Sequence, residues 1–140
     1  MSGAKHGDVI KVAHSLYSHY GIYVKTLFGE RVIHYTGEDG PQDLNGIVRE
    51  TDLSVFLNGE EDYQVCHLDP KVFKTIYSGS ETVARAKSKL SNKGYNLLWN
   101  NCEHFAIWCK TGESVSSQVR DLTYGIPDNV FSFFEDLFNF

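Results

Sequence analysis

The sequence predicts an α+β fold in which an antiparallel β-sheet comes first along the chain and helices follow. Two observations carry this prediction. The first half alternates between polar residues and β-branched or aromatic residues, which is typical of half-buried strands, and the second half changes to a helical period. A length of 140 residues supports one domain around a single core. With 41% hydrophobic and 22% charged residues, the composition is that of a globular protein.

The expected strands are short segments rich in Val, Ile and Tyr. They span residues 8–12, 19–24 and 31–35, with two further candidates at 47–50 and 63–67. The second and third strands are separated by a turn that contains Gly29 and is expected to span 25–30, so they should form a hairpin. Residues 37–46, with Pro41, are expected to form a loop. Within 51–59, Leu53, Phe56 and Leu57 have helical spacing.

Two helices are expected in the second half. The first covers residues 80–90, whose composition favours a helix, and is stopped by Asn92 and Gly94. The second covers residues 102–110, with Asn101 as its N-cap and Gly112 at its end. The order of the elements is therefore sheet first and helices second, without an internal repeat.

Charge and cysteine content exclude several classes of function. The net charge of -5 and the scattered basic residues do not favour nucleic acid as a partner. No apolar run has the length of a signal peptide or of a membrane span, which predicts a cytoplasmic protein. The three cysteines form no CxxC pair and are odd in number, so neither a disulfide framework nor a common zinc site is indicated.

Cys102 is the candidate nucleophile. It stands in the first turn of its expected helix, where backbone N–H groups and the helix dipole favour a thiolate. His19 and His34 fall on strands expected to be adjacent, so that one imidazole can take the thiol proton while the other orients it. Position alone leaves open the alternative that Cys102 is a small buried residue without chemistry.

Four sequence blocks resemble those of the lecithin:retinol acyltransferase-like family. They are residues 7–12, 18–24, 32–35 and 101–105, in the same order and at similar spacing as in that family. The string Asn-Cys-Glu-His-Phe at 101–105 is the most specific of them, and Gln118-Val119-Arg120-Asp121 resembles the small phospholipid-metabolising members. The resemblance implies a circularly permuted papain-like fold of the NlpC type, with a catalytic domain over residues 1–125.

By the same resemblance, Cys102 is the nucleophile, His19 the general base and His34 the third, polarising residue. The implied substrate is an acyl ester of a phospholipid, and the acyl group passes through a thioester to water, an amine, a hydroxyl or a lysophospholipid. The oxyanion is expected to meet the backbone N–H of Cys102, with Tyr17 as a further candidate donor. No cofactor is implied.

The remaining histidines and cysteines are expected to be structural. His104 should fix its helix by hydrogen bonding, and Cys109 and Cys66 should be buried as small apolar residues. The other three are assigned to strand ends, the surface or the flexible start of the chain, namely His14, His67 and His6. A metal site built from His14, His19, His34 and Cys102 lacks the paired spacing of common metal ligands.

The segment 126–140 carries five phenylalanines and is too short to span a bilayer. By the resemblance, it is expected to take the place of the transmembrane anchor in which several family members end. A short amphipathic helix at a membrane interface and packing on the protein's own sheet or on a second copy both remain open. Two other functions also remain open. One is a non-catalytic interaction module, as in certain picornavirus 2A proteins that resemble this family, and the other is a cysteine amidase or peptidase.

Overall fold

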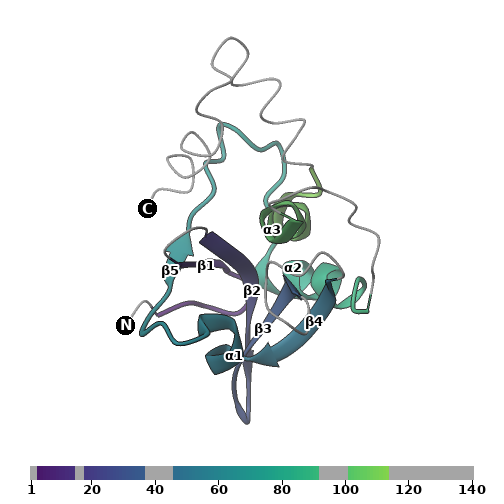
Figure 1. Cartoon of the computed structure of the whole chain (residues 1–140). Coiled ribbons are helices and arrows are strands. Elements are labelled where there is room, and N and C mark those ends of the chain that lie inside the picture. The colour runs from purple at the N-terminus through teal and green to yellow at the C-terminus, as the bar shows by residue number, and fades with distance from the viewer. Residues whose placement is uncertain (1–2, 15–17, 37–45, 92–100, 114–140) are drawn as a thin grey trace.

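A computed structural model describes residues 3–14, 18–36, 46–91 and 101–113, and its central feature is a five-stranded antiparallel sheet in the order β4-β3-β2-β1-β5 (Figure 1). The elements are β1 (Val9–Ala13), β2 (Ser18–Thr26), β3 (Gly29–Thr36), β4 (Ile47–Asp52), α1 (Leu53–Leu57), β5 (Gln64–Cys66), α2 (Gly79–Lys87) and α3 (Asn101–Thr111). The predicted α+β class is confirmed. All five expected strands form, and the helical spacing within 51–59 corresponds to α1.

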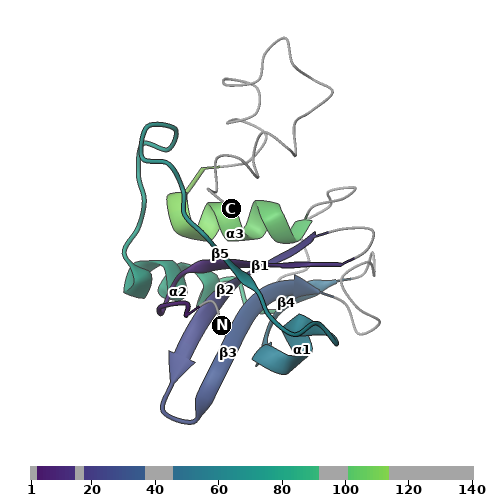
Figure 2. The same ribbon diagram turned by 90° about the vertical axis from the view of Figure 1, so that its left-hand side faces the viewer.

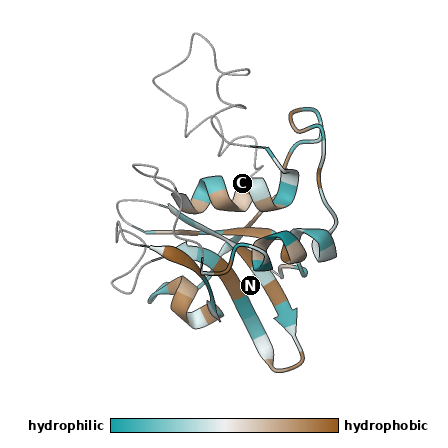
Figure 3. Cartoon of the chain, turned by 90° about the vertical axis from the view of Figure 1, so that its right-hand side faces the viewer, coloured by the Kyte–Doolittle hydropathy of each residue, from teal (hydrophilic) through white to brown (hydrophobic). Residues whose placement is uncertain are grey.

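The sheet is covered on both faces because its strands bury side chains on both sides. Phe105 and Ile107 of α3 and Val83 of α2 pack against one face, around Ile22 and Ile33. Phe56 of α1 packs against the other face with a separate set, which is Ile10, Val12, Tyr23, Val32 and Tyr63. Figure 2 shows α3 on one side of the sheet and α1 on the other. Apolar stretches of the strands lie between these helices (Figure 3).

The β2–β3 hairpin turns more tightly than the sequence predicted. The ladder continues to the pair Thr26↔Gly29, so only Leu27 and Phe28 form the turn, and the expected turn over 25–30 is wrong. The Thr26 hydroxyl donates to the Gly29 carbonyl at 2.7 Å and accepts from the Phe28 amide at 3.2 Å. Gly29 has φ +133°, which favours glycine. The polar pair Lys25↔Glu30 therefore belongs to the ladder and not to the turn.

The ends of α2 and α3 differ slightly from the prediction. Ser78 caps α2 by accepting from the Glu81 amide, and the helix ends at Lys87, before the predicted stop. Asn101, expected to precede the second helix as its cap, is already the first residue of α3. Gly112 ends α3 as predicted, with φ +77° and its amide donating to the Trp108 carbonyl at 2.8 Å.

Several predictions fall outside the described residues. They concern the loop 37–45, the stops Asn92 and Gly94, the oxyanion candidate Tyr17, the block 118–121 and the tail 126–140. A search of the described residues for a helix of membrane-spanning length and hydropathy finds none.

Candidate active site

The β2–β3 pair separates at the end opposite its turn, and the candidate residues gather there. The β2–β3 ladder runs from Thr26↔Gly29 only as far as Ile22↔Ile33. Beyond that point, residues 18–21 of β2 pair with β1, and residues 34–36 of β3 pair with β4. His19 and His34 both belong to these separated segments. The two histidines therefore lie where the β2–β3 ladder has ended, with their side chains in contact.

His19 and His34 contact each other directly, as their predicted placement on adjacent strands required. His19 Nε2 lies 2.8 Å from His34 Nδ1, and the two ring centroids are 5.0 Å apart with an edge-to-face inclination of 66°. Both side chains are buried, His19 completely. The second ring nitrogen of His34, Nε2, lies 2.9 Å from Thr51 Oγ1. The other nitrogen of His19, Nδ1, is buried and has no hydrogen-bond partner among the described residues.

Phe56 and Gly21 shape this histidine pair, although no sequence pattern predicted either of them in the site. The Phe56 ring stacks on His19 at 5.0 Å between centroids and contacts His34 edge-on at 5.3 Å. A Cβ at Gly21 would lie 2.5 Å from Val32 Cγ1 and 2.9 Å from Phe56 Cε1. A glycine inside a strand often marks such a close approach and was the available signal. Phe56 gave none, because an apolar residue on a short helix resembles any core residue.

Cys102 lies in the first turn of α3, as predicted, with its sulfur beside β2. Its Sγ donates to the Ser18 carbonyl at 3.9 Å, and a backbone hydrogen bond from Tyr20 also reaches the sulfur. These two residues flank His19 in the strand. The thiol is therefore held against the backbone on both sides of the candidate base. Cys102 comes from the α3 face of the sheet, whereas the Phe56 ring that holds the histidines comes from the α1 face.

The protonation state of the thiol differs from the sequence expectation. The pKa of Cys102 is raised to about 12, chiefly by burial and to a smaller extent by the neighbouring Glu103 carboxylate. Backbone hydrogen bonds from Tyr20 and from the start of the helix oppose the rise. Desolvation thus outweighs the helix terminus that predicted a thiolate. The direction of this shift favours the neutral thiol over the thiolate at neutral pH.

The two imidazoles are neutral as well. Burial lowers the pKa of His34 to about 4, with a further contribution from the Arg49 charge. Burial also lowers the pKa of His19 well below its usual value, and the neighbouring His34 and His14 lower it further. A neutral imidazole has one bare nitrogen that can accept a proton. The site therefore contains a thiol and a proton acceptor in their uncharged forms.

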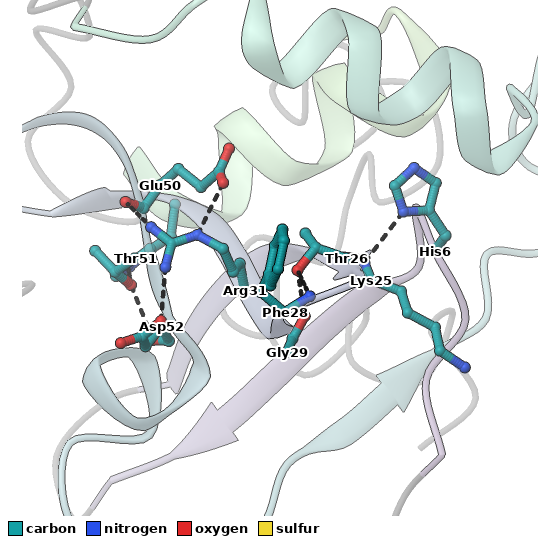
Figure 4. Close-up of polar contacts among 10 residues, drawn as sticks. His6, Lys25, Thr26, Phe28, Gly29, Arg31, Glu50, Thr51 and Asp52 are labelled. Carbon is teal, nitrogen blue, oxygen red and sulfur yellow. Dashed lines mark hydrogen bonds and ion pairs between the residues drawn. The ribbon is translucent and has the colours of Figure 1, made fainter.

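The other candidates take structural positions. Cys109 and Cys66 are buried in the core, as predicted. His14 follows β1 directly, and its Nδ1 is 3.6 Å from Glu60 Oε2. His6, expected in the flexible start of the chain, accepts from the Lys25 amide through Nδ1 at 3.1 Å (Figure 4). No group of three or more potential metal-ligating His, Cys, Asp or Glu residues occurs in the described part of the chain.

Comparison with known proteins identifies relatives of the whole described region. The family model for lecithin retinol acyltransferase matches residues 2–115. The chain is 30% identical over 133 residues to lecithin retinol acyltransferase of Rattus norvegicus, covering 81% of this chain and 57% of the relative. The human protein of that name is also 30% identical, over 131 residues, covering 80% of this chain and 56% of the relative.

A relative with a different name matches at similar identity. Phospholipase A and acyltransferase 3 of Mus musculus is 28% identical over 131 residues, which cover 84% of this chain and 76% of the relative. The chain thus spans a little more than half the length of the matched lecithin retinol acyltransferases and about three quarters of this relative.

Proposed function

Because the chain belongs to the lecithin retinol acyltransferase family, we propose that it is a cysteine-dependent acyltransferase or phospholipase A-type hydrolase acting on phospholipid acyl esters. One observation carries the proposal. The buried His19–His34 pair leaves Nδ1 of His19 without a partner among the described residues, and the Cys102 sulfur contacts the strand on both sides of this histidine. This arrangement supports the proposed roles of Cys102 as nucleophile, His19 as base and His34 as orienting group, the set that covalent acyl transfer requires.

The proposed first half-reaction forms a thioester. His19 Nδ1 takes the Cys102 proton as Sγ attacks the ester carbonyl carbon, and a tetrahedral oxyanion forms. The oxyanion is stabilised by the Cys102 backbone N–H, with Tyr17 as a further candidate donor. The carbon–oxygen ester bond then breaks, and the imidazolium returns its proton to the departing lysophospholipid oxygen.

The second half-reaction releases the acyl group. Neutral His19 removes a proton from water or from an acceptor hydroxyl or amine, which attacks the thioester carbonyl. The carbon–sulfur bond breaks, and the thiolate takes the proton back from the imidazolium. The two half-reactions follow a ping-pong order. Because thiol and imidazole both start neutral, the thiolate forms only when His19 takes the proton during attack.

The proposed fold relationship is a permuted papain-like arrangement. Its support is the chain order, in which the histidine strands β2 and β3 precede the cysteine helix α3. A phospholipid substrate also requires access to a lipid surface. Peripheral contact through residues 126–140 stays a prediction from their five phenylalanines.

Intact-mass analysis after incubation with phosphatidylcholine tests the function. We expect an adduct of one acyl chain that hydroxylamine removes, as it removes a thioester. Cys102→Ala should form no adduct, whereas the matched variant Cys109→Ala, which changes a core cysteine, should still form it. An adduct that persists in folded Cys102→Ala would contradict the mechanism. Binding of several phospholipids without any adduct would favour the non-catalytic interaction module.

A further inference from the structure

We propose that Thr51 is a positioning residue that fixes the tautomer of His19, so that Nδ1 is the ring nitrogen without a proton. The inference deepens the proposed function and rests on it, because only a bare nitrogen can accept the Cys102 proton. Thr51 lies on β4, two strands away from His19, and acts on it through His34.

The Thr51 hydroxyl determines which atom donates in each hydrogen bond between Thr51, His34 and His19. Thr51 Oγ1 donates to the Asp52 carbonyl at 3.1 Å, and the same oxygen lies 2.9 Å from His34 Nε2. A hydroxyl has one proton to donate. Since that proton is directed at the Asp52 carbonyl, Thr51 Oγ1 can only accept from His34. His34 Nε2 therefore carries the proton of that ring.

The proton on His34 Nε2 in turn determines which nitrogen of His19 is protonated. A neutral imidazole has one N–H, so a proton on His34 Nε2 leaves His34 Nδ1 as an acceptor. The atom 2.8 Å from it is His19 Nε2, which must then be the donor. His19 Nδ1 is left bare. Burial keeps the pKa of both rings low, so neither ring carries a second proton at neutral pH.

The burial of His19 Nδ1 independently disfavours the reverse direction of these hydrogen bonds. If Thr51 donated to His34, both imidazoles would reverse, and His19 Nδ1 would carry an N–H. That nitrogen is buried without a hydrogen-bond partner among the described residues. A buried N–H without an acceptor is rarer in proteins than an acceptor that lacks a donor. The Asp52 carbonyl and the environment of Nδ1 therefore favour the same tautomer.

Arg31 holds the residues on both sides of Thr51. Its guanidinium donates to Glu50 Oε2 at 2.9 Å, to the Glu50 carbonyl at 3.2 Å and to Asp52 Oδ1 at 2.6 Å (Figure 4). Asp52 is also the N-cap of α1, the helix that carries Phe56. The carbonyl of an N-cap residue accepts the first backbone bond of its helix, which restrains its direction. Thr51 thus donates to an acceptor fixed by both the ion-pair network and α1.

Long-range proton–nitrogen NMR of ¹⁵N-labelled full-length protein tests the inference, because it distinguishes protonated from bare ring nitrogens. In the wild type we expect His19 and His34 both to be protonated at Nε2. Thr51→Val removes the acceptor and should shift both rings toward the reverse tautomer. With a short-chain soluble ester, kcat should fall about 10–100-fold at nearly unchanged KM, less than the roughly 10⁴-fold effect of a wrong tautomer in a serine protease.

Two variants separate positioning from folding. Thr51→Ser keeps the hydroxyl and should restore both the tautomers and kcat. Thr82→Val removes a buried hydroxyl that donates to the Ser78 carbonyl at 2.8 Å in α2, and it should leave the histidine signals unchanged.

A wild-type His34 protonated at Nδ1 would overturn the inference, even if Thr51→Val failed to fold. Unchanged tautomers in folded Thr51→Val would overturn it as well. Expected tautomers and shifts in a protein that turns over no acyl ester would instead refute the proposed function and leave the Thr51 inference standing.

Discussion

The two ends of the β2–β3 pair use the same two strands in opposite ways. At one end the ladder closes in a two-residue turn, and Leu27 and Phe28 are 97% and 98% exposed. At the other end the strands part, and His19 and His34 are 0% and 2% exposed. Strand alternation is the same at both ends. What differs is whether other elements cover the strands, since β1, β4, α1 and α3 cover the separated end and the adjoining part of the ladder but leave the turn exposed.

This difference shows that burial, more than residue type, produces the chemistry of the site. Two imidazoles in water would titrate near pH 6.5 and would have no fixed tautomer. Held between sheet and helices, both are neutral, and each has a defined neighbour. The apolar tip of the hairpin, formed by Leu27 and Phe28, has no comparable restraint on its exposed side chains. Substitutions at the separated end should therefore alter function most, and substitutions at the tip should alter it least.

The largest effect on turnover is expected at His19, and the same substitution at His34 provides the comparison. His19→Gln should lose turnover by roughly 10²–10⁴-fold, because an amide cannot accept the thiol proton. His34→Gln should keep a measurable fraction, since its amide oxygen can accept from His19 Nε2–H. Steady-state kinetics on a soluble ester, with folding checked by circular dichroism, compares them. Equal losses in two folded variants would contradict the different roles.

Acid should destabilise the separated end. Because burial lowers the pKa of His34 from 6.5 to about 4, the unfolded chain binds a proton there more readily than the folded protein between these values. Stability from this group is fully present above pH 6.5 and is lost as pH falls toward 4, by up to about 3 kcal/mol. His19 acts in the same direction.

Denaturant unfolding at several pH values measures this dependence. His34→Gln removes one titrating group, so its stability should fall less steeply than that of the wild type between pH 6.5 and 4. Parallel curves for the two proteins would show that His34 is not buried in its neutral form.

Alanine substitutions at two glycines, one at each end, should have smaller effects on stability and turnover that can be compared directly. Gly21→Ala at the separated end would bring Cβ within 2.5 Å of Val32 Cγ1 and 3.2 Å of His34 Cβ, and should cost about 1–3 kcal/mol together with much of the turnover. Gly29→Ala at the tip meets no atom within 4 Å and should cost about 1 kcal/mol through its positive φ alone, without loss of turnover. Thermal melts and ester kinetics distinguish the two costs. Full turnover in Gly21→Ala would show that the histidines tolerate the added methyl group.

The sequence predicted the strands, the α+β class and the contact between His19 and His34, because these follow from local alternation and a short hairpin. It predicted the position of Cys102 but the wrong direction for its pKa, since desolvation depends on tertiary packing that no local pattern contains. Thr51 and Phe56 were missed for the same reason. Each reaches the histidines through the fold, from β4 and α1, and neither stands in a motif of its own.

The smallest effect is expected at the tip itself. Leu27→Ser combined with Phe28→Ser removes two side chains that are almost wholly exposed, so no buried apolar area is lost on folding. The turn bonds involve the Thr26 hydroxyl, the Phe28 amide and the Gly29 carbonyl, all of which the substitutions keep. We therefore expect a change in unfolding free energy within about 0.5 kcal/mol and unchanged kcat/KM on a soluble ester. A loss above 1 kcal/mol would mean that the tip is covered in solution, and reduced turnover would mean that it communicates with the separated end along β2 and β3. Either result would contradict the contrast between the two ends, because that contrast predicts that substitutions at the tip leave the stability and the chemistry of the separated end unchanged.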